Sequence, residues 1–458
     1  MKLASAWAPY IPDARSPWNL RRVVHLHRRA GFGATWGEIQ RDLKDGPKLS
    51  IDRLLAGKTY SEGVPAEFES TAALLRDSAT SSKDPSRLKA WWIYRMLFGP
   101  DPLTERLVLM WHNHFATSNL KVDDLEAMRN QNDVSRKWAR APFGELLNAI
   151  VRDRALLFWL DATANRKGHP NENLGRELME LFTLGVGHYT ETDVKEAARA
   201  LTGWGIGTDG QFQHRPLQHD DGDKTILGNT GRWSGDDLVQ MLLESPATAS
   251  RLALRLCEQF MGECSVDAAA VAELASGLRE HNLDIGWAVE IILRSQAFFA
   301  DRNIKRRIVG PVEFVVGPIR ALELFDPPPS TLVLAEWIAR LGQDLFYPPN
   351  VGGWSGGRTW LTTRSLIART NYASALVLGS GVGRTKSLDA VGLALRHGAG
   401  NSIDSIVDFF ARLLLGLEPD KEWRDRFMAA LGPRKNGELG TLQNVVGLML
   451  ATPEAQVA

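Results

Sequence analysis

The sequence contains little cysteine and no excess of either charge. Cys257 and Cys264 are the two cysteines among 458 residues, too few for a disulfide framework, and such usage is typical of a reducing compartment. Lysine and arginine together number 54, as do aspartate and glutamate, so the formal net charge is zero. Nucleic-acid-binding and membrane-surface proteins usually carry a broad positive field, and this balance argues against both classes.

Long apolar runs are missing as well. No segment approaches the roughly 20 apolar residues that a membrane-spanning helix needs. The first 15 residues include Pro9, Pro12 and Asp13 and hold no apolar stretch of signal-peptide length. From these absences we expect a cytoplasmic protein.

The residues that are present are typical of a globular helical protein. Hydrophobic residues make up 44% of the chain and charged residues 24%, which is enough apolar material for a sizeable core. From Ser86 to Phe98 the apolar residues recur mostly at spacings of three and four, and Gly99-Pro100 ends the pattern. Similar helical runs cover residues 103–115, 143–160, 174–185 and 191–204.

Two segments interrupt this helical pattern. Residues 205–233 are rich in glycine and aspartate and contain the turn sequence Asp209-Gly210, which predicts a small β-hairpin or an ordered loop. Residues 346–360 contain two prolines and four glycines, which predict a second irregular insert. We therefore expect a mainly α fold with a large helical body and these two inserts.

The same patterns suggest three regions along the chain. We expect an N-terminal helical region at 1–102, a motif-rich core at 103–235 and a C-terminal helical region at 236–458. The C-terminal region has a weak internal repeat, because RLALRLCEQFMGE at 251 and FFARLLLGLEP at 409 begin blocks that end in similar pieces. Two amphipathic helices with similar ends would give the same pattern by chance.

The first group of chemically capable residues is Trp111-His112-Asn113-His114-Phe115, at the end of an apolar helix. Side chains two residues apart point about 200° apart on a helix with ~3.6 residues per turn, so the two imidazoles cannot bind one metal ion from a regular helix. Either the helix ends here and a ring turns inward as a proton carrier, or His114 caps the helix and His112 bonds the core backbone. Under the first alternative both histidines are candidate catalytic residues.

The second group lies on the helix that follows the polar loop from Asn165 to Asn173. On a helical wheel Glu177 falls between Leu181 and Leu184, on the apolar face. A carboxylate in that position must be paired, coordinated to a metal or protonated, because an isolated buried charge is unstable. Glu177 is therefore the leading candidate for a general base or a metal ligand.

Neighbouring polar residues extend this hypothesis. Glu172 is either a first-turn acid favoured by the helix dipole or a second catalytic carboxylate. Glu180 has a simpler expected role, an ion pair with Arg176 one turn away. The candidate substrate-binding residues are Asn165, Arg166, Asn173, Arg176 and Trp204.

The third group is His219-Asp220-Asp221-Gly222-Asp223, in the glycine-rich insert. The spacing of an EF-hand calcium loop is missing. His219 with Asp220 or Asp221 could complete a shell for a divalent transition metal, together with a histidine near position 112 and Glu177. A plain polar loop is the alternative.

Several of these segments also carry a family resemblance. HRRAGFGAT at 27–35, LTERLVLMWHNHFATS at 103–118, the long motif at 161–204, HDDGDKTILGNTG at 219–231 and YPPNVGGWSGGRTWL at 347–361 resemble the domain-of-unknown-function family numbered 1800. The resemblance covers nearly the whole chain. It implies no settled activity. It does imply a possible sulfatase-like companion and an export signal, and this chain has no visible signal.

Three functions follow as hypotheses. The first is a hydrolase or lyase that uses Glu177 with His112 or His114, possibly with a metal, on a small molecule. The second is a non-catalytic assembly protein in which the same residues form a buried polar network. The third is a protein that binds or cleaves a glycan, because tryptophan platforms beside paired carboxylates such as Glu172 and Glu177 suit sugars.

Overall fold

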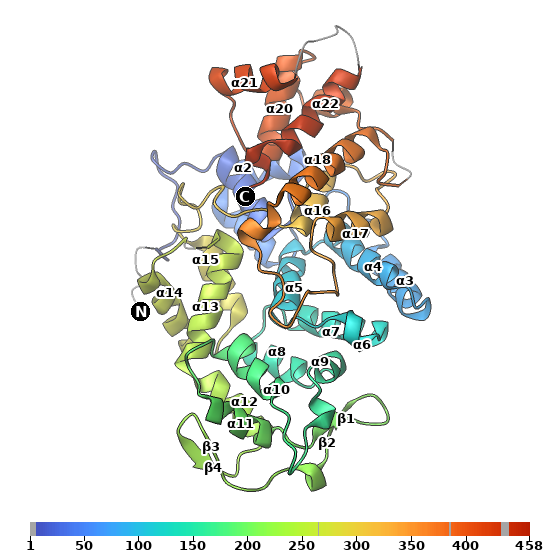
Figure 1. Ribbon diagram of the computed structural model, residues 1–458. Coiled ribbons are helices and arrows are strands. Elements are labelled where there is room, and N and C mark those ends of the chain that lie inside the picture. The colour runs from blue at the N-terminus through green and yellow to red at the C-terminus, as the bar shows by residue number, and fades with distance from the viewer. Residues whose placement is uncertain (1–5, 264, 384–385, 432–438) are drawn as a thin grey trace.

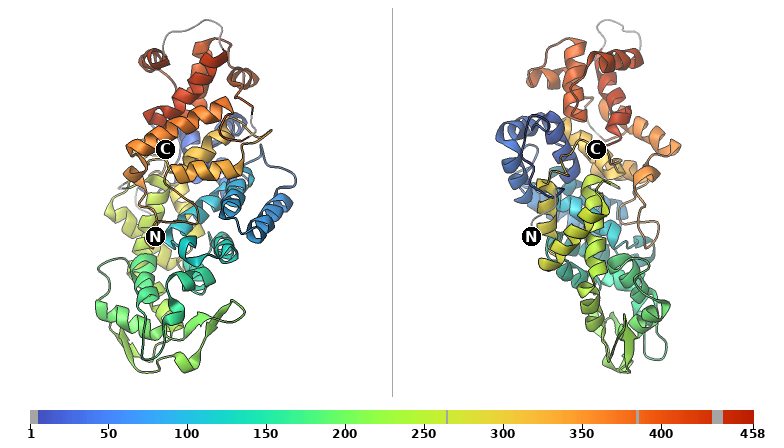
Figure 2. Two further views of the ribbon diagram at one scale, coloured as in Figure 1. Left: turned by 45° about the vertical axis from the view of Figure 1, so that its right-hand side comes forward. Right: turned by 90° about the vertical axis from the view of Figure 1, so that its left-hand side faces the viewer.

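The chain folds into an elongated, mainly helical molecule, as the sequence predicts (Figure 1). The computed structural model describes residues 6–263, 265–383, 386–431 and 439–458. Two small β-hairpins lie at one end of the molecule and α20–α22 lie at the other, in all three ribbon views (Figures 1 and 2). Within the described residues, no helix combines the length and the apolar character that a bilayer crossing requires.

The helices occupy most of the chain. The first four are α1 (Leu20–Ala30), α2 (Trp36–Leu55), α3 (Phe68–Ser81) and α4 (Pro85–Phe98). The next seven are α5 (Pro102–His114), α6 (Asn119–Val122), α7 (Leu125–Lys137), α8 (Phe143–Ile150), α9 (Arg154–Trp159), α10 (Asn173–Glu177) and α11 (Glu191–Ala200). Then follow α12 (Gly235–Glu244), α13 (Pro246–Met261), α14 (Ala268–Glu280), α15 (Ile285–Arg294), α16 (Pro311–Ala321), α17 (Thr331–Arg340), α18 (Thr363–Leu378), α19 (Ala390–Arg396), α20 (Ile403–Leu415), α21 (Lys421–Leu431) and α22 (Leu439–Ala451).

Local signals explain where these helices begin. Proline occupies the first turn of α4 and α5, where its missing N–H costs no hydrogen bond. Thr190 and Asp193 form a capping box at the start of α11. The helical run at 143–160 is not continuous, however, because Asp153 accepts a hydrogen bond from the Leu156 N–H and begins α9 as a separate helix.

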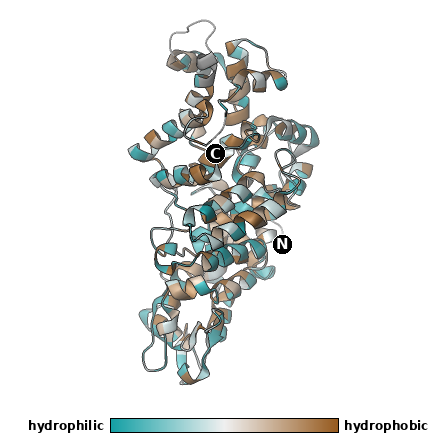
Figure 3. Cartoon of the chain, turned by 90° about the vertical axis from the view of Figure 1, so that its right-hand side faces the viewer, coloured by the Kyte–Doolittle hydropathy of each residue, from teal (hydrophilic) through white to brown (hydrophobic). Residues whose placement is uncertain are grey.

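One hydrophobic core joins the N-terminal, central and C-terminal parts of the described chain. Helix α5 is buried along most of its length, and the indole of Trp111 at its C-terminal end is wholly buried. Along many helices in Figure 3 the apolar and polar residues alternate in patches, as expected for helices that bury one face. Helix α5 therefore lies in the core, and packing against its neighbours holds the groups at its C-terminal end in place.

Both predicted inserts are present. In the first, β1 (Trp204–Ile206) pairs with β2 (Phe212–His214), and β3 (Lys224–Ile226) pairs with β4 (Asn229–Gly231), both antiparallel. The second insert is irregular apart from one 3₁₀ turn, η4 (Gly357–Trp360). Its start is bound to the first residue of α6, because the Asn119 N–H donates to the Phe346 carbonyl at 2.9 Å.

Of the two cysteines, Cys257 is a buried free thiol on α13. Burial raises the pKa of this thiol to about 12, so it is a weak nucleophile at neutral pH. Cys264 lies outside the described residues.

Candidate functional site

The most polar of the large cavities lies beside α5, between α13 and the second insert. Its volume is about 730 Å³, and its walls come from α5, α13, the segment before α16, and residues 354–360. This space is enough for a drug-sized ligand. We call it the central cavity.

One wall is built by the approach of the second insert to Asn113. The Asn113 side-chain amide accepts a hydrogen bond from the Trp354 N–H at 2.7 Å and donates to the Trp354 carbonyl at 3.2 Å. A Cβ atom on Gly353 would lie 2.2 Å from the Asn113 Oδ1, and Gly353 has a φ of +75°. Glycine is therefore required at this contact.

His112 supports the same insert from the core. Its Nε2 accepts a hydrogen bond from the Phe346 N–H at 3.1 Å, and its ring packs against Trp92, Phe346 and Trp354. Burial lowers the pKa of His112 to about 3, so the ring is neutral at physiological pH. The contacts correspond to the alternative in which this histidine bonds the core backbone.

His114 points to a different place. Its Nε2 donates to the Phe182 carbonyl at 3.1 Å, and burial together with Arg255 and Arg251 lowers its pKa. Phe182 lies in η2 (Leu178–Thr183), where the predicted helix 174–185 widens into a π-helix. Arg251 donates to the neighbouring Leu181 carbonyl at 2.9 Å. The side chains of His114 and Arg251 thus both donate hydrogen bonds to carbonyls of the π-helical turn.

The central cavity contains cationic side chains without carboxylate partners. Arg255, Arg306 and Arg358 line it, and within the described residues no ion pair or hydrogen bond involves any of their guanidinium groups. Lys305 also lines it, and burial lowers the pKa of this amine to about 8. The cavity wall therefore carries three guanidinium groups that no carboxylate contacts within ion-pair distance.

Three carboxylates also line this cavity, those of Glu258, Glu263 and Glu313. Glu258 lies on α13 one turn after Arg255, and Glu263 lies just beyond the helix end. Burial raises the pKa of Glu258, the attraction of Arg255 lowers it less, and the charge of Glu263 raises it again. A carboxyl with a raised pKa that faces a ligand cavity is a candidate proton donor or acceptor.

Glu177 lies outside this cavity. It is half-buried on α10, and burial and the charge of Glu180 raise its pKa, with Arg176 opposing. Among the described residues no hydrogen bond, ion pair or ring contact joins Glu177 to His112 or His114. The three leading candidates therefore have separate surroundings.

Ion pairs engage the other charged residues around α10. Arg176 binds Glu172 at 2.9 Å and Glu191 at 2.8 Å. The expected pair between Arg176 and Glu180 is not the one formed, because Glu180 accepts a hydrogen bond from the Tyr189 hydroxyl. Glu172 is thus part of a surface ion pair.

The polar loop before α10 is held by its own hydrogen bonds. Buried Asn165 donates to the Ala198 carbonyl at 2.8 Å and accepts from the Asn171 N–H at 3.0 Å. Exposed Asn173 donates to Asp161 at 3.2 Å, while Arg166 is exposed. Asn165 thereby joins the loop to α11.

The residues proposed as metal ligands in the first insert have other partners. His219 donates from Nδ1 to the Thr202 carbonyl at 3.0 Å, and Asp220 binds Arg199 at 2.8 Å. That hydrogen-bonded Arg199 lowers the pKa of Asp220 to about 2. Among the described residues no group of three His, Cys, Asp or Glu is arranged to hold a metal ion, so the predicted transition-metal shell does not form from these side chains.

Trp204 is also a packing residue. Its indole is buried, lies edge-on to Phe212 at 5.1 Å and has the Arg152 guanidinium 4.9 Å from its ring centroid. These contacts hold the first hairpin against α9 and α12.

Comparison with known proteins gives one result. A family model with the description "Protein of unknown function (DUF1800)" matches residues 25–457. The chain belongs to this family. No curated protein and no solved structure matches it.

Two of the segments that carry the DUF1800 resemblance meet at the central cavity. Residues 103–118 contribute Leu109, Met110 and Asn113, and residues 347–361 contribute the insert from Trp354 to Trp360. Both lie far from Glu177 in the sequence. These two family segments therefore lie against cationic side chains from outside the motifs that carry the resemblance. Arg358 is the exception, because it lies within the motif at 347–361.

The residues predicted from the sequence did not include Arg255, Glu258, Lys305 and Arg306. A signal for two of them exists, because Arg251, Arg255 and Glu258 recur at spacings of four and three on the otherwise apolar α13. Lys305-Arg306-Arg307 form a basic triplet. Neither pattern shows that the charged residues of α13 and the basic triplet line the same cavity as Trp354 and Arg358.

Proposed function

We propose that this DUF1800 protein binds a negatively charged small molecule in the central cavity and acts on it by acid–base chemistry, as a hydrolase or a lyase does. The observation that carries the proposal is the set of unpaired guanidinium groups of Arg255, Arg306 and Arg358 around one cavity. Arginines without carboxylate partners favour an anionic ligand, since guanidinium groups bind carboxylate and phosphate oxygens by charge-assisted hydrogen bonds.

Glu258 is the proposed proton carrier in place of Glu177. It lines the cavity, forms no ion pair within 4 Å among the described residues, and has a raised pKa. A raised pKa brings a carboxyl closer to the neutral pH range in which general acid–base catalysis is most efficient. The adjacent cations would orient the ligand and stabilise negative charge that develops during the reaction.

A binding experiment tests the first half of the proposal. Isothermal titration calorimetry with phosphate, sulfate and citrate should detect binding to the full chain, and Arg255→Gln and Arg358→Gln should each raise the Kd about tenfold by removing a charge-assisted bond. Arg426→Gln is the matched control, because that exposed arginine pairs with Glu422 on α21. Binding that is undetectable, or equal in all variants, would refute the proposal.

An activity experiment tests the second half. The probes are 4-nitrophenyl phosphate, 4-nitrophenyl sulfate and mono-4-nitrophenyl esters of dicarboxylic acids. Glu258→Gln should abolish any turnover and keep the anion affinity, whereas Glu177→Gln should keep both. Loss of turnover in Glu177→Gln alone would instead return the proton-transfer role to α10.

A carbohydrate ligand is a second candidate. Trp354 and Trp360 both line the central cavity, beside Glu258 and Glu263, and indole faces with carboxylates suit sugar rings. Quenching of tryptophan fluorescence by an acidic sugar such as glucuronate, but not by acetate, would favour it.

A further inference from the structure

The inner end of the central cavity contains an unusual ion cluster. Arg307 lines the cavity, and its guanidinium bonds Glu313 Oε1 at 2.5 Å. Arg106 donates to the same oxygen from behind, where its side chain is wholly buried. The second oxygen of Glu313 accepts from the Gly310 N–H at 2.8 Å. A single carboxylate thus serves two arginines.

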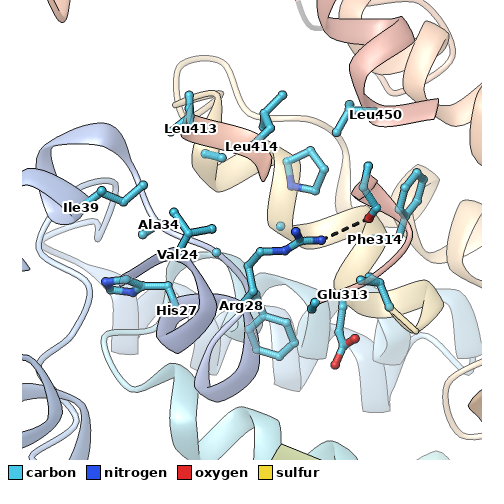
Figure 4. Close-up of a pocket in the computed structure, with 18 residues that line it drawn as sticks. Val24, His27, Arg28, Ala34, Ile39, Glu313, Phe314, Leu413, Leu414 and Leu450 are labelled. Carbon is cyan, nitrogen blue, oxygen red and sulfur yellow. Dashed lines mark hydrogen bonds between the residues drawn. The ribbon is translucent and has the colours of Figure 1, made fainter. Parts of the chain in front are cut away.

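Two more arginines adjoin this cluster without any carboxylate within ion-pair distance. Arg29 is wholly buried and donates to the Met261 and Asn303 carbonyls at 3.0 and 3.1 Å. Arg28 crosses a small apolar cavity to reach the Ala455 carbonyl at 3.1 Å, while Glu313 points away from the leucines of that cavity (Figure 4). Burial, together with neighbouring guanidinium groups, lowers the pKa of Arg29 and of Arg106.

Several buried N–H groups of this cluster have no acceptor. They belong to Nε and Nη1 of Arg29, to Nε and Nη2 of Arg106, and to Nε of Arg307. Two guanidinium groups therefore share one carboxylate, and two more lie near them with only backbone carbonyls as acceptors, so positive charge exceeds negative charge behind Arg307. Such an arrangement is stable only if further negative charge balances it.

From this imbalance we infer that Arg307 marks an inner subsite for a doubly charged phosphate group, carried by an organic phosphate monoester or present as inorganic phosphate. The inference rests on the proposed function and names the class of its ligand. A dianion gains about twice the Coulomb attraction of a monoanion at the same place, and the attraction is strong where water is excluded. Arginine also matches phosphate oxygens with paired donors.

Two ligands of the same shape and different charge provide the test. At pH 8 methyl phosphate carries about two negative charges, whereas methyl sulfate carries one. Calorimetry with the full chain should show methyl phosphate binding at least tenfold more tightly. Inorganic phosphate identifies the source: affinity equal to that of methyl phosphate indicates free phosphate, and weaker affinity indicates an ester. Equal affinities for methyl phosphate and methyl sulfate would overturn the inference.

Three variants test whether the preference for methyl phosphate depends on the ion cluster around Arg307. Arg307→Gln should reduce the preference for methyl phosphate to less than threefold. Glu313→Gln removes the carboxylate that Arg106 and Arg307 share. Without phosphate the melting temperature of this variant should be lower than that of the unaltered protein, and added phosphate should raise it by more. Glu336→Gln, at an exposed carboxylate of α17 that pairs with Arg340 and does not line the cavity, should do neither.

If these variants do not fold, the unaltered protein still decides the matter. Lowering the pH from 8 to 5 removes one charge from methyl phosphate and none from methyl sulfate. Protonation of Lys305 and Glu258 in the cavity affects both ligands, so the affinity for methyl phosphate should fall relative to that for methyl sulfate. A preference unaffected by pH, or retained in Arg307→Gln, contradicts the subsite. Absence of any anion binding would refute the proposed function itself, whereas binding that depends on Arg255 and not on ligand charge would refute the inner subsite alone.

Discussion

At the scale of single residues, the structural role of His112 follows from its hydrogen bond. Its neutral ring accepts from the Phe346 N–H. In His112→Phe that buried N–H has no acceptor, so the free energy of unfolding should fall by about 1–3 kcal/mol. Urea denaturation measures the loss, with exposed His188→Ala as the control. Unchanged stability with lost turnover would instead assign the ring a chemical role.

A second residue-scale prediction concerns Asp153, whose carboxylate accepts from Gln131 at 2.8 Å and from the Leu156 N–H. Burial raises its pKa to about 7. The unfolded chain, with a pKa of about 3.9, releases this proton first, so the free energy of unfolding falls as the pH rises from about 4 to 7 and then levels off.

Asp153→Asn removes this titration and retains an acceptor for Gln131 and an N-cap. Its stability relative to the unaltered protein should therefore grow across the same pH window. Thermal unfolding at pH 5, 6, 7 and 8 measures it, and the exposed Asp425→Asn is the control. Parallel curves for the two proteins would show that Asp153 ionises normally in the folded state.

At the scale of elements, the second insert depends on its contact with α5. Gly353→Ala adds a Cβ that would meet Asn113, and it should lower the stability by about 1–3 kcal/mol from the strained backbone alone, with more from the collision. Gly398→Ala is a matched control outside the cavity, because its φ is +79° and a Cβ there would have no neighbour within 4 Å.

Ligand affinity separates the two glycine variants further. Both should share the backbone cost, but Gly353→Ala alone should displace Trp354 and weaken phosphate binding in calorimetry. If both variants bind phosphate equally, the Asn113 contact does not shape the central cavity.

At the scale of the whole molecule, the hairpins lie at one end of an elongated fold (Figures 1 and 2). The central cavity is lined by residues of α5, α13 and the second insert and by none of the hairpins. Trp204→Leu should speed hydrogen exchange in residues 204–231, because the packing against Phe212 and Arg152 is lost. Phosphate affinity should stay within about twofold, since distant sites act independently. A larger loss of affinity would restore Trp204 as a binding residue.

The local features of this protein follow from the order of its residues alone. The capping box at Thr190, the prolines that open α4 and α5, and the Asp209-Gly210 turn between β1 and β2 each depend on a few neighbouring side chains. The mainly α fold and both inserts were therefore predictable. The π-helix of η2 and the break at Asp153 were missed, because distant partners and one cap override the apolar period.

The site required contacts that no local pattern contains. Asn113 meets Trp354 across 241 positions, and Arg106 meets Glu313 across 207. A helical wheel reports which side of a helix is apolar, but a cavity exists only where several such helices leave space between them. For that reason the apolar periodicity pointed to Glu177. In the folded chain, the charged side chains without ion-pair partners lie around Glu258 and Arg307 instead.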